Sequence, residues 1–413
     1  MSGDLASVHY RLLSEHFQAC VDLSERERDA YLLGPRLDDP ALREDLRALL
    51  AYHARAPEVA VDLPAVRRSG IRDVLPFLGL GALAPLALLA PAGPARWAVA
   101  GLVSFLAGAL FAGRHRGPAF GFYELKGPIG QGGVGDVYLA RHSVLHRRAA
   151  LKVLRASRPD AAAVARFKRE ARLAGRLGHP NAVQIFDYGE TPDGRLYYAM
   201  EYVDGLNLAQ LLSVEGPLPL ARSLYLLRQI SGALEEAHGL GLLHRDLKPS
   251  NIMVARRGGL GDVVKILDFG LASSGSGRST RLEGTPAYIA PERIRQPRRP
   301  DVRSDIYSFG GVAFHMLTGR SVFEGPGPAE LLYQVFLSAR PSPSKLRGEP
   351  LPAALERLVL DCLAVDPASR PSSMREITGH LRSIATPDRW SQDEARAWWS
   401  ANGDRIARLK GVN

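Results

Sequence analysis

The chain has 413 residues, which is enough for about two or three domains and for a core that folds without disulfides. Its formal net charge is +10, but the basic residues lie in helical patterns that also carry Asp and Glu, so they indicate solvated surfaces and argue against nucleic acid as a partner. Cys20 and Cys362 have no metal-binding or disulfide-framework spacing, which favours a reducing compartment.

Residues 1–66 are the first predicted segment, a small helical module on the cytoplasmic side. Charged and apolar residues alternate here at helical spacing. Asp39 before Pro40 predicts a helix start, and an apolar leucine stripe follows between residues 42 and 50. The segment holds no catalytic constellation. Two roles therefore stay open: docking or regulation, and a solubilising appendage.

Two uncharged apolar stretches follow, at residues 74–90 and 97–113. At 1.5 Å per residue each is roughly 24 to 26 Å long, slightly short of the roughly 30 Å hydrocarbon core of a bilayer. Arginines flank the pair on its outer sides and the turn between carries only Arg96, which predicts two transmembrane helices with both flanks in the cytoplasm. The alternative is a buried helical hairpin of a soluble protein.

The next segment begins at residue 121 and is expected to be a strand, a glycine-rich turn and a second strand. Gly130, Gly132 and Gly135 have G-x-G-x-x-G spacing, which would let backbone amides approach a polyphosphate. The same spacing occurs in dinucleotide-binding folds and in plain turns. Here it leads into a strand, whereas a dinucleotide fingerprint opens a helix. A third predicted strand carries Lys152.

A helix is then predicted to start at Asp160 and to carry Glu170 near its middle. One role for this glutamate is an exposed ion pair with Arg166, four residues earlier. The other follows from a buried lysine that needs orienting. In that case Glu170 holds the Lys152 ammonium against nucleotide phosphates.

Between residues 121 and 384, short stretches follow one another in a fixed order. They are IGQGGVGDVYLA, AALK, FKREA, HPNAV, YAMEYVDG, HRDLKPSN, DFGLA, GTPAYIAPE, SDIYSFG and DPASRP. Together they resemble the bacterial serine/threonine protein kinases of the eukaryotic-like (Hanks-type) family. The early stretches are individually weak, but HRDLKPSN followed by DFG and APE at this spacing is specific. The resemblance implies an α+β fold with a small β-rich lobe and a large α-helical lobe.

The resemblance also implies the roles of the most polar residues. Asp246 would orient the substrate hydroxyl and accept its proton, and Lys248 would neutralise charge on the transferred phosphoryl group. Asn251 and Asp268 would hold Mg²⁺, or Mn²⁺ in its place. Catalysis by such a set consists of positioning and electrostatic stabilisation.

ATP is the implied nucleotide, with Lys152 on its α- and β-phosphates and Glu170 holding the lysine. Met200 resembles the family's gatekeeper residue, and Asp204 would reach the ribose. The other implied nucleotide contacts are Ile129, Gly130, Gly132, Gly133, Gly135, Val137, Glu201 and Val203.

Regulation is implied by Arg245, which directly precedes Asp246. In this family such an arginine pairs with a phosphate on the activation loop. Ser279 and Thr280 are the predicted sites of autophosphorylation, which a homodimer would carry out in trans. The other interpretation is that this Gly/Ser stretch is only a flexible loop. Thr285, like the lysine after the base, resembles serine/threonine rather than tyrosine kinases.

Residues 385–413 are predicted to form a Trp-rich C-terminal helix that starts with a capping box at Ser391 and Glu394. The helix either packs back on the large lobe or binds a partner or a membrane surface. Glu292 and Arg370 are expected to form a buried structural ion pair.

The sequence therefore predicts a kinase that uses Mg-ATP, acts on Ser/Thr acceptors of proteins, and is tethered in the bacterial inner membrane. Its kinase domain and N-terminus would face the cytoplasm. Two other functions stay open: a catalytically silent kinase fold that acts as a scaffold or switch, and a small-molecule kinase. The complete catalytic set disfavours the first, and the GTPAYIAPE stretch disfavours the second.

Overall fold

The structure is a computed structural model of the chain. From residue 120 to 409 it describes all residues except 132–134, 158–159, 192, 271–285, 296–300, 326–330, 332–333, 337 and 386–388; nearer the N-terminus it describes residues 12, 15–17, 19–20, 23–34, 37 and 39–53. Both stretches predicted to span a membrane lie outside these residues. Within the described part of the chain, no helix combines the length and the apolarity that a membrane crossing requires.

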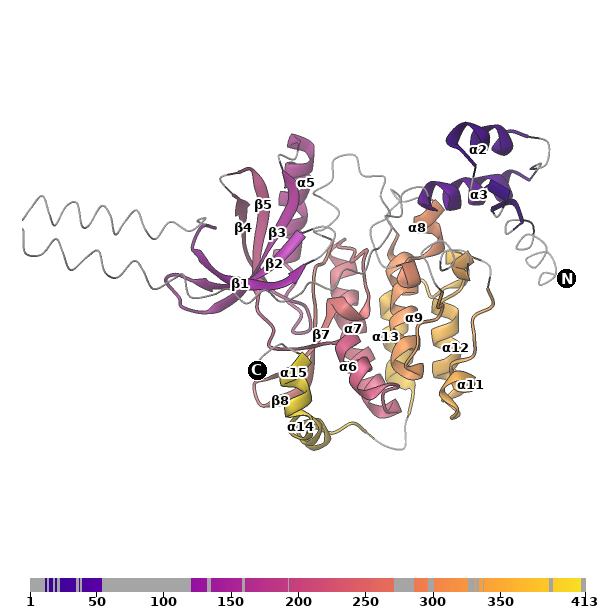
Figure 1. Ribbon diagram of the computed structural model, residues 1–413. Helices are drawn as coiled ribbons and strands as arrows, with labels where there is room; N and C mark the ends of the chain where they lie inside the picture. The colour runs from indigo at the N-terminus through magenta and orange to yellow at the C-terminus, as the bar shows by residue number, and fades with distance from the viewer. Residues whose placement is uncertain are drawn as a thin grey trace, which may run out of the picture.

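A five-stranded antiparallel sheet forms the small lobe, in the order β1-β2-β3-β5-β4. The helix α5 (Ala161–Gly175) packs beside it, as Figure 1 shows. The strands are β1 (Tyr123–Gln131), β2 (Gly135–His142), β3 (Arg148–Ser157), β4 (Ile185–Glu190) and β5 (Arg195–Glu201). The predicted order of strand, turn, strand, strand and helix is confirmed.

The central strand β3 is apolar on both faces, because successive side chains point to opposite sides of a sheet. Ala149 and Leu151 belong to a small outer core, whereas Ala150 and Leu154 belong to the main core that includes α5. Lys152 shares the parity of the second pair. Its side chain therefore faces α5 and the large lobe.

The helix α5 begins as predicted, because the Asp160 side chain accepts a hydrogen bond of 2.7 Å from the Ala163 backbone and caps the first turn. Phe167 and Ala171 are buried on its apolar face. The helix ends at Gly175. Leu177 lies just past this end, and its side chain is also buried.

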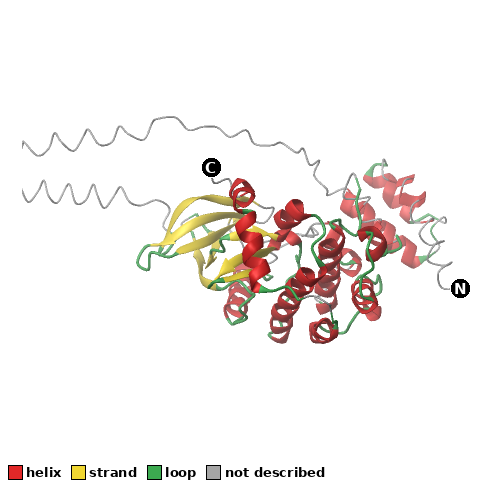
Figure 2. Cartoon of the chain, turned by 90° about the horizontal axis from the view of Figure 1, so that it is seen from below, coloured by secondary structure: helices red, strands yellow, loops and turns green. Residues whose placement is uncertain are grey.

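The large lobe is mostly helical, and a three-stranded antiparallel sheet lies where it meets the small lobe; Figure 2 shows the strands gathered on one side and the helices on the other. The strands are β6 (Gly205–Asn207), β7 (Ile252–Arg257) and β8 (Leu260–Ile266). The helices are α6 (Leu208–Glu215), α7 (Leu220–Gly239), α8 (Pro291–Arg295), α9 (Val302–Thr318), α11 (Pro343–Arg347), α12 (Ala353–Cys362) and α13 (Met374–Ser383), with 3₁₀ turns η3 (Pro249–Asn251), η5 (Pro286–Tyr288) and η6 (Pro367–Ser369).

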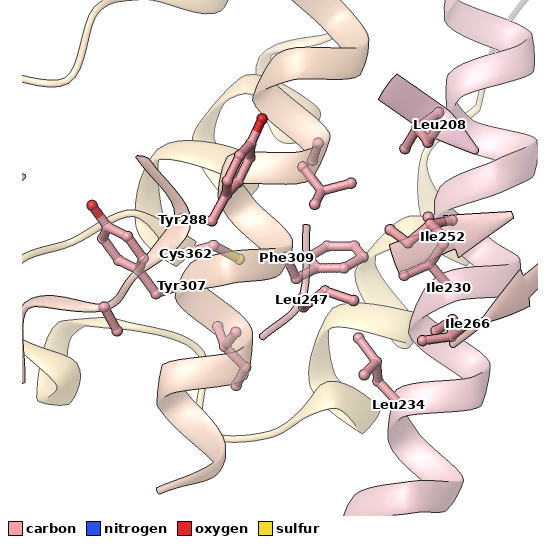
Figure 3. Packing of buried hydrophobic residues seen from close by; sticks show 14 of the residues in the cluster. Leu208, Ile230, Leu234, Leu247, Ile252, Ile266, Tyr288, Tyr307, Phe309 and Cys362 are labelled. Carbon is pink, nitrogen blue, oxygen red and sulfur yellow. The ribbon is translucent and has the colours of Figure 1, made fainter. Parts of the chain in front are cut away.

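The core of the large lobe lies between α7, α9 and the β7–β8 hairpin. Figure 3 shows Phe309 of α9 and Ile230 of α7 with Leu247 between them. All three side chains are at most 2% exposed. Leu247 directly follows Asp246, so its burial in the core holds the predicted catalytic segment in place.

The helices α2 (Glu25–Leu32) and α3 (Pro40–His53) lie within the described part of the predicted N-terminal module. The second starts directly after Asp39, and its side chains Leu42, Leu46 and Leu50 are buried. They belong to the same apolar core as the large lobe, and α3 contacts α8 (Figure 1). The described part of this segment thus packs on the large lobe, and its role stays a prediction.

At the other end of the chain, α14 (Gln392–Ala401) and α15 (Gly403–Leu409) follow the kinase-like part. The capping box at Ser391 and Glu394 is confirmed. The helix α14 packs on β8, with Ala395 and Trp399 buried. Packing on the large lobe, one of the two predicted roles, is what the structure shows.

Candidate active site

Lys152 lies in the middle of β3 and is 8% exposed. Strand register places it opposite Val137 of β2 and Tyr198 of β5. Its ammonium Nζ lies 2.7 Å from Oδ2 of Asp268. The lysine of the small lobe is thus joined directly to the acidic residue that follows β8 in the large lobe.

Asp268 has a left-handed backbone, with φ of 57°, and its carboxylate is held at both oxygens. Lys152 binds Oδ2, and the hydroxyl of Tyr198 donates to Oδ1 at 2.6 Å. Burial alone would raise the pKa of the Asp268 carboxyl, but Lys152 and the Tyr198 hydrogen bond outweigh it, so that the pKa lies below its ordinary value. Asp268 is therefore an ionised, oriented oxygen donor.

Glu170 does not pair with Lys152 as predicted. Its Oε1 accepts a hydrogen bond of 2.8 Å from Nη1 of Arg245, and the glutamate is only 4% exposed. The prediction considered two cations for Glu170, Arg166 on the same helix and Lys152. The fold brings a third one, Arg245, from the catalytic segment to α5, while the Asp268 carboxylate binds the lysine. The alternative prediction, an exposed ion pair of Glu170 with Arg166, is also wrong, because Glu170 is buried.

The catalytic segment brings Asp246, Lys248 and Asn251 together. Lys248 Nζ lies 2.8 Å from Oδ2 of Asp246. The side-chain amide of Asn251 donates to the backbone oxygen of Asp246 at 2.8 Å and to its Oδ2 at 3.1 Å. Because Asn251 directly precedes β7 and its carbonyl accepts from the Leu267 amide, it lies at the same end of the hairpin as Asp268.

Asp305 of α9 supports this segment, and sequence reasoning gave it no role. Its carboxylate accepts hydrogen bonds of 2.8 Å from the backbone amides of His244 and Arg245, and it lies 2.9 Å from the His238 ring. Burial tends to raise the pKa of Asp305, but His238 and the amides hold it below its ordinary value. The stretch SDIYSFG contains this residue, so a signal was present. The Arg245 backbone is left-handed, with φ of 67°, and the two bonds stabilise it.

Of the glycine-rich turn, Gly130 and Gly135 lie within the described residues, whereas Gly132 and Gly133 lie outside them. A side chain at Gly135 would overlap the backbone carbonyl of Val153, so the close approach of β2 to β3 requires glycine there. No such neighbour crowds Gly130. Access of the backbone to phosphate was the predicted reason for glycine at these positions. It therefore explains Gly130 better than Gly135.

The apolar residues predicted to flank the nucleotide differ in exposure. Ile129 is 48% exposed, at the end of β1, whereas Val137 is partly buried against the main core. Met200 is 4% exposed, and Val203 also packs against that core. These side chains come from the small lobe and from the segment that joins the lobes.

Glu201 in the segment joining the lobes turns its side chain toward the β7–β8 hairpin. Its Oε2 lies 2.9 Å from Nζ of Lys265, and Oε1 is paired with Arg257. Burial lowers the pKa of Lys265 to about 8. The carboxylate is thus used structurally, which leaves the backbone of Glu201 for its implied contact with the nucleotide. Asp204, predicted to reach the ribose, is exposed and lies 3.9 Å from Arg148.

The residues present fit ATP with a divalent metal. Mg²⁺ prefers hard oxygen donors, which the Asp268 carboxylate and the Asn251 amide oxygen supply. The Asn251 nitrogen is directed to Asp246, which leaves its oxygen as the available donor atom. The ammonium of Lys152 lies beside Asp268 and supplies a positive charge that would bind the phosphates.

The two predicted phosphate acceptors of the activation loop, Ser279 and Thr280, lie outside the described residues, and so does Thr285. The ion pair of Glu292 and Arg370 is confirmed. Two parallel hydrogen bonds of 2.8 Å join them, and the arginine is 4% exposed. Burial tends to raise the pKa of Glu292, and Arg370 outweighs it and holds the pKa below its ordinary value.

Tyr198 was missed because nothing in its local sequence distinguishes it from a core aromatic; only the register opposite Lys152 brings it to the site. Replacing it by phenylalanine keeps the ring and removes the bond to Asp268. We expect the free energy of unfolding to fall by about 1.5–3 kcal/mol, which is typical of a hydrogen bond to a charged group. Urea denaturation measures it. Tyr202→Phe, at a half-buried position just after β5, keeps the ring and should change the free energy of unfolding little. Equal losses for the two variants would contradict the assignment.

Comparison with known proteins gave consistent matches. A family model described as the protein kinase domain matches residues 123–381. The serine/threonine-protein kinase pkn3 of Myxococcus xanthus is 40% identical over 272 residues, covering 63% of this chain and 50% of the relative. The serine/threonine-protein kinase PknB of Mycobacterium tuberculosis is 40% identical over 269 residues, covering 63% of this chain and 42% of the relative. The chain therefore spans half or less of the length of these two relatives.

Among solved structures, the crystal structure of the Mycobacterium tuberculosis PknI kinase domain is similar. The TM-score is 0.51 and the sequences are 31% identical. The match covers 64% of this chain and 97% of that domain. The similarity thus extends over nearly the whole of the solved domain, whereas the segments at both ends of this chain lie outside it.

Proposed function

The chain belongs to the protein kinase family, and from this premise we propose that it transfers the γ-phosphoryl group of ATP to serine or threonine hydroxyls of proteins, in bacterial signal transduction. One observation carries the proposal. Each member of the set Lys152, Asp246, Lys248, Asn251 and Asp268 contacts another member at 3.1 Å or less.

The roles of these residues follow from their positions. Asp246 is partly exposed, so a hydroxyl can reach its carboxylate, which accepts the proton as the hydroxyl attacks. Lys248 stays beside it and offsets negative charge on the transferred group. When bound, Mg-ATP supplies the phosphoryl group and the positive charge of the metal. Asn251 and Asp268 would hold that metal.

In this proposal Lys152 binds the α- and β-phosphates, and Glu170 holds the lysine once it exchanges its present partner, Arg245, for Lys152. The pairing with Arg245 is a different arrangement of the same charges. Moving Glu170 to the lysine would free the guanidinium of Arg245 for a phosphate on the activation loop. We therefore keep Arg245 as the regulatory residue, with Ser279 or Thr280 as the phosphorylated partner.

Serine and threonine are the proposed acceptors because Lys248 follows Asp246 by two residues and because pkn3 and PknB are named serine/threonine-protein kinases. The first experiment incubates the full chain with Mg-ATP and maps the products by mass spectrometry. Phosphoserine or phosphothreonine in the wild type alone, and not in the Asp246→Asn variant, is expected. A wild type that binds nucleotide but transfers nothing would favour the scaffold function instead.

The same mass spectra test activation. Phosphate on Ser279 or Thr280 in the active enzyme supports autophosphorylation, and an unmodified loop in fully active enzyme contradicts it. Modification that rises more steeply than the protein concentration indicates transfer in trans within a homodimer. Small residues at every fourth position of the stretch at 97–113 would let two such helices approach closely.

Membrane tethering is a separate proposal, supported by the two uncharged stretches and their flanking arginines. It places the chain in the bacterial inner membrane, with the kinase domain and the N-terminus in the cytoplasm. Protease added outside sealed vesicles with the cytoplasmic face inward should leave both ends of the chain intact. Digestion of the N-terminal module from outside would contradict this topology.

A further inference from the structure

A fully buried ion pair lies in the large lobe, away from the site described above. Arg222 in the first turn of α7 donates to Asp262 of β8 through two hydrogen bonds, of 2.8 and 2.9 Å. Both residues are 0% exposed. A buried pair of charges is tolerated only when its remaining hydrogen-bonding capacity is also satisfied.

The C-terminal segment satisfies the carboxylate of this pair, whereas Nη1 of Arg222 has no hydrogen bond among the described residues and lies 4.0 Å from Oε2 of Glu215. The indole N–H groups of Trp390 and Trp399 donate to the two carboxylate oxygens of Asp262, each at 2.8 Å. The guanidinium of Arg222 lies 4.1 Å from the ring centre of Trp398 and 5.0 Å from that of Trp390. Residues 389–409 therefore complete a charge cluster of the kinase lobe, although the family match ends at residue 381. We call this set the tryptophan cluster.

The helix α14 is fitted tightly to β8. A side chain at Gly261 would place its Cβ 2.8 Å from that of Ala395, so this approach requires glycine. The Gln392 side chain accepts a hydrogen bond of 2.8 Å from the Gly261 amide and donates to the Tyr225 hydroxyl at 2.9 Å. The segment is thus held on the hairpin by backbone contacts as well as by the cluster.

The same segment also holds α6. The Trp398 indole donates to Oε1 of Glu215 at 2.6 Å, and Arg405 donates to the Val214 carbonyl at 3.0 Å. Both acceptors lie at the C-terminal end of α6. The other end of this helix starts at Asn207, three residues after the segment that joins the lobes.

The two elements that the segment contacts, the β7–β8 hairpin and α6, are both connected to the part of the active site that is proposed to bind the nucleotide. The β7–β8 hairpin begins directly after Asn251 and ends two residues before Asp268, the two proposed metal ligands. Its residue Lys265 is bound to Glu201 in the segment that joins the lobes. A shift of the hairpin or of α6 would therefore move the groups that hold the base, the ribose and the metal.

We propose that residues 389–409 are a positioning element for the nucleotide site, acting through the β7–β8 hairpin and α6, with Trp398 and Trp399 as its positioning residues. The inference rests on the proposed function, because it assigns this segment a part in binding Mg-ATP. It predicts an effect on nucleotide affinity rather than on the chemical step, since no residue of the segment is in the catalytic set.

The test compares Trp398→Phe and Trp399→Phe in the full chain. Each keeps an aromatic ring and removes one N–H donor, to Glu215 or to Asp262. We expect the KM for ATP and the Kd for Mg-ATP to rise about three- to tenfold, with kcat at saturating ATP within about twofold of wild type. Arg396→Ala is the matched control on the same helix, because Arg396 is exposed and pairs only locally with Asp393 among the described residues.

A purely structural segment gives a different result. In that case the variants lower the melting temperature and the active fraction, while KM and Kd stay at the wild-type values, and the proposal is overturned. If either tryptophan variant fails to fold, Glu215→Gln decides, because Glu215 lies half-buried at the C-terminal end of α6 and its loss of charge weakens the Trp398 bond and the 4.0 Å ion pair with Arg222 while keeping the side chain. If the wild type binds Mg-ATP without transferring phosphate, the proposed function fails and the Kd comparison still tests positioning.

Discussion

Replacing Asp246 by asparagine is expected to lower the rate of phosphoryl transfer by about 10²- to 10⁴-fold, the usual contribution of a general base. Asparagine has nearly the same size and can keep the contacts with Lys248 and Asn251, which lie 2.8 and 3.1 Å from Oδ2. It cannot accept the proton of the attacking hydroxyl. Nucleotide affinity should stay within about threefold, because Asp246 is not among the nucleotide contacts. Turnover and Mg-ATP titration measure the two quantities.

Asp361→Asn is the control for this comparison, since Asp361 is half exposed and forms a surface ion pair with Arg357. It should transfer phosphate at the wild-type rate. An Asp246→Asn protein as active as the wild type would mean that another group accepts the proton. Equal loss of turnover and nucleotide binding would point to a misplaced catalytic segment rather than to missing chemistry.

Replacing Arg370 by leucine is expected to lower the free energy of unfolding by about 3–5 kcal/mol, the typical effect of breaking a buried ion pair. Arg370 makes two hydrogen bonds of 2.8 Å to Glu292 of α8. It also donates to the backbone carbonyls of Ala364 and Arg303, each at 2.8 Å. The variant leaves the carboxylate and these carbonyls without their donor. Denaturant unfolding monitored by tryptophan fluorescence measures the loss.

Arg375→Leu provides a control of the same residue type. Its side chain is 87% exposed and lies 3.2 Å from Glu235, so the contribution of this pair should be within about 1 kcal/mol. Similar losses for both variants would show that the burial of Arg370 does not decide its effect. A loss confined to the Arg370 variant would identify the ion pair of Arg370 with Glu292 of α8 as a main stabilising contact of the large lobe.

The sequence predicted the parts of the fold and the site that depend on local spacing. Asp160 and Ser391 were identified as helix caps because a cap and its partner lie within three residues. Asp246, Lys248 and Asn251 lie within six residues, so their proximity follows once the segment is known to be catalytic. These local features do not depend on contacts with distant parts of the chain.

Contacts between distant segments could not be predicted in the same way. The pairing of Glu170 with Arg245 joins residues 75 positions apart, and the bond between Tyr198 and Asp268 spans 70 positions. In each case the local sequence does not show the partner, because only the three-dimensional approach of α5 and of the strands brings the two residues together. The tryptophans were seen as a helix that packs, but their acceptor, Asp262, lies more than 120 positions away.

The two ion pairs at the lobe interface also have a mechanical consequence. The small lobe is attached to the large lobe by the chain at 201–204 and by backbone hydrogen bonds that join Asn181 and Val183 to Ile266 of β8. Side-chain contacts add to these, among them Lys152 with Asp268 and Glu170 with Arg245. If Glu170 moves to Lys152, its contact lies within the small lobe, and the ionic link between α5 and the catalytic segment is lost. The backbone attachments remain, so the exchange of one ionic partner releases α5 from the large lobe without separating the lobes.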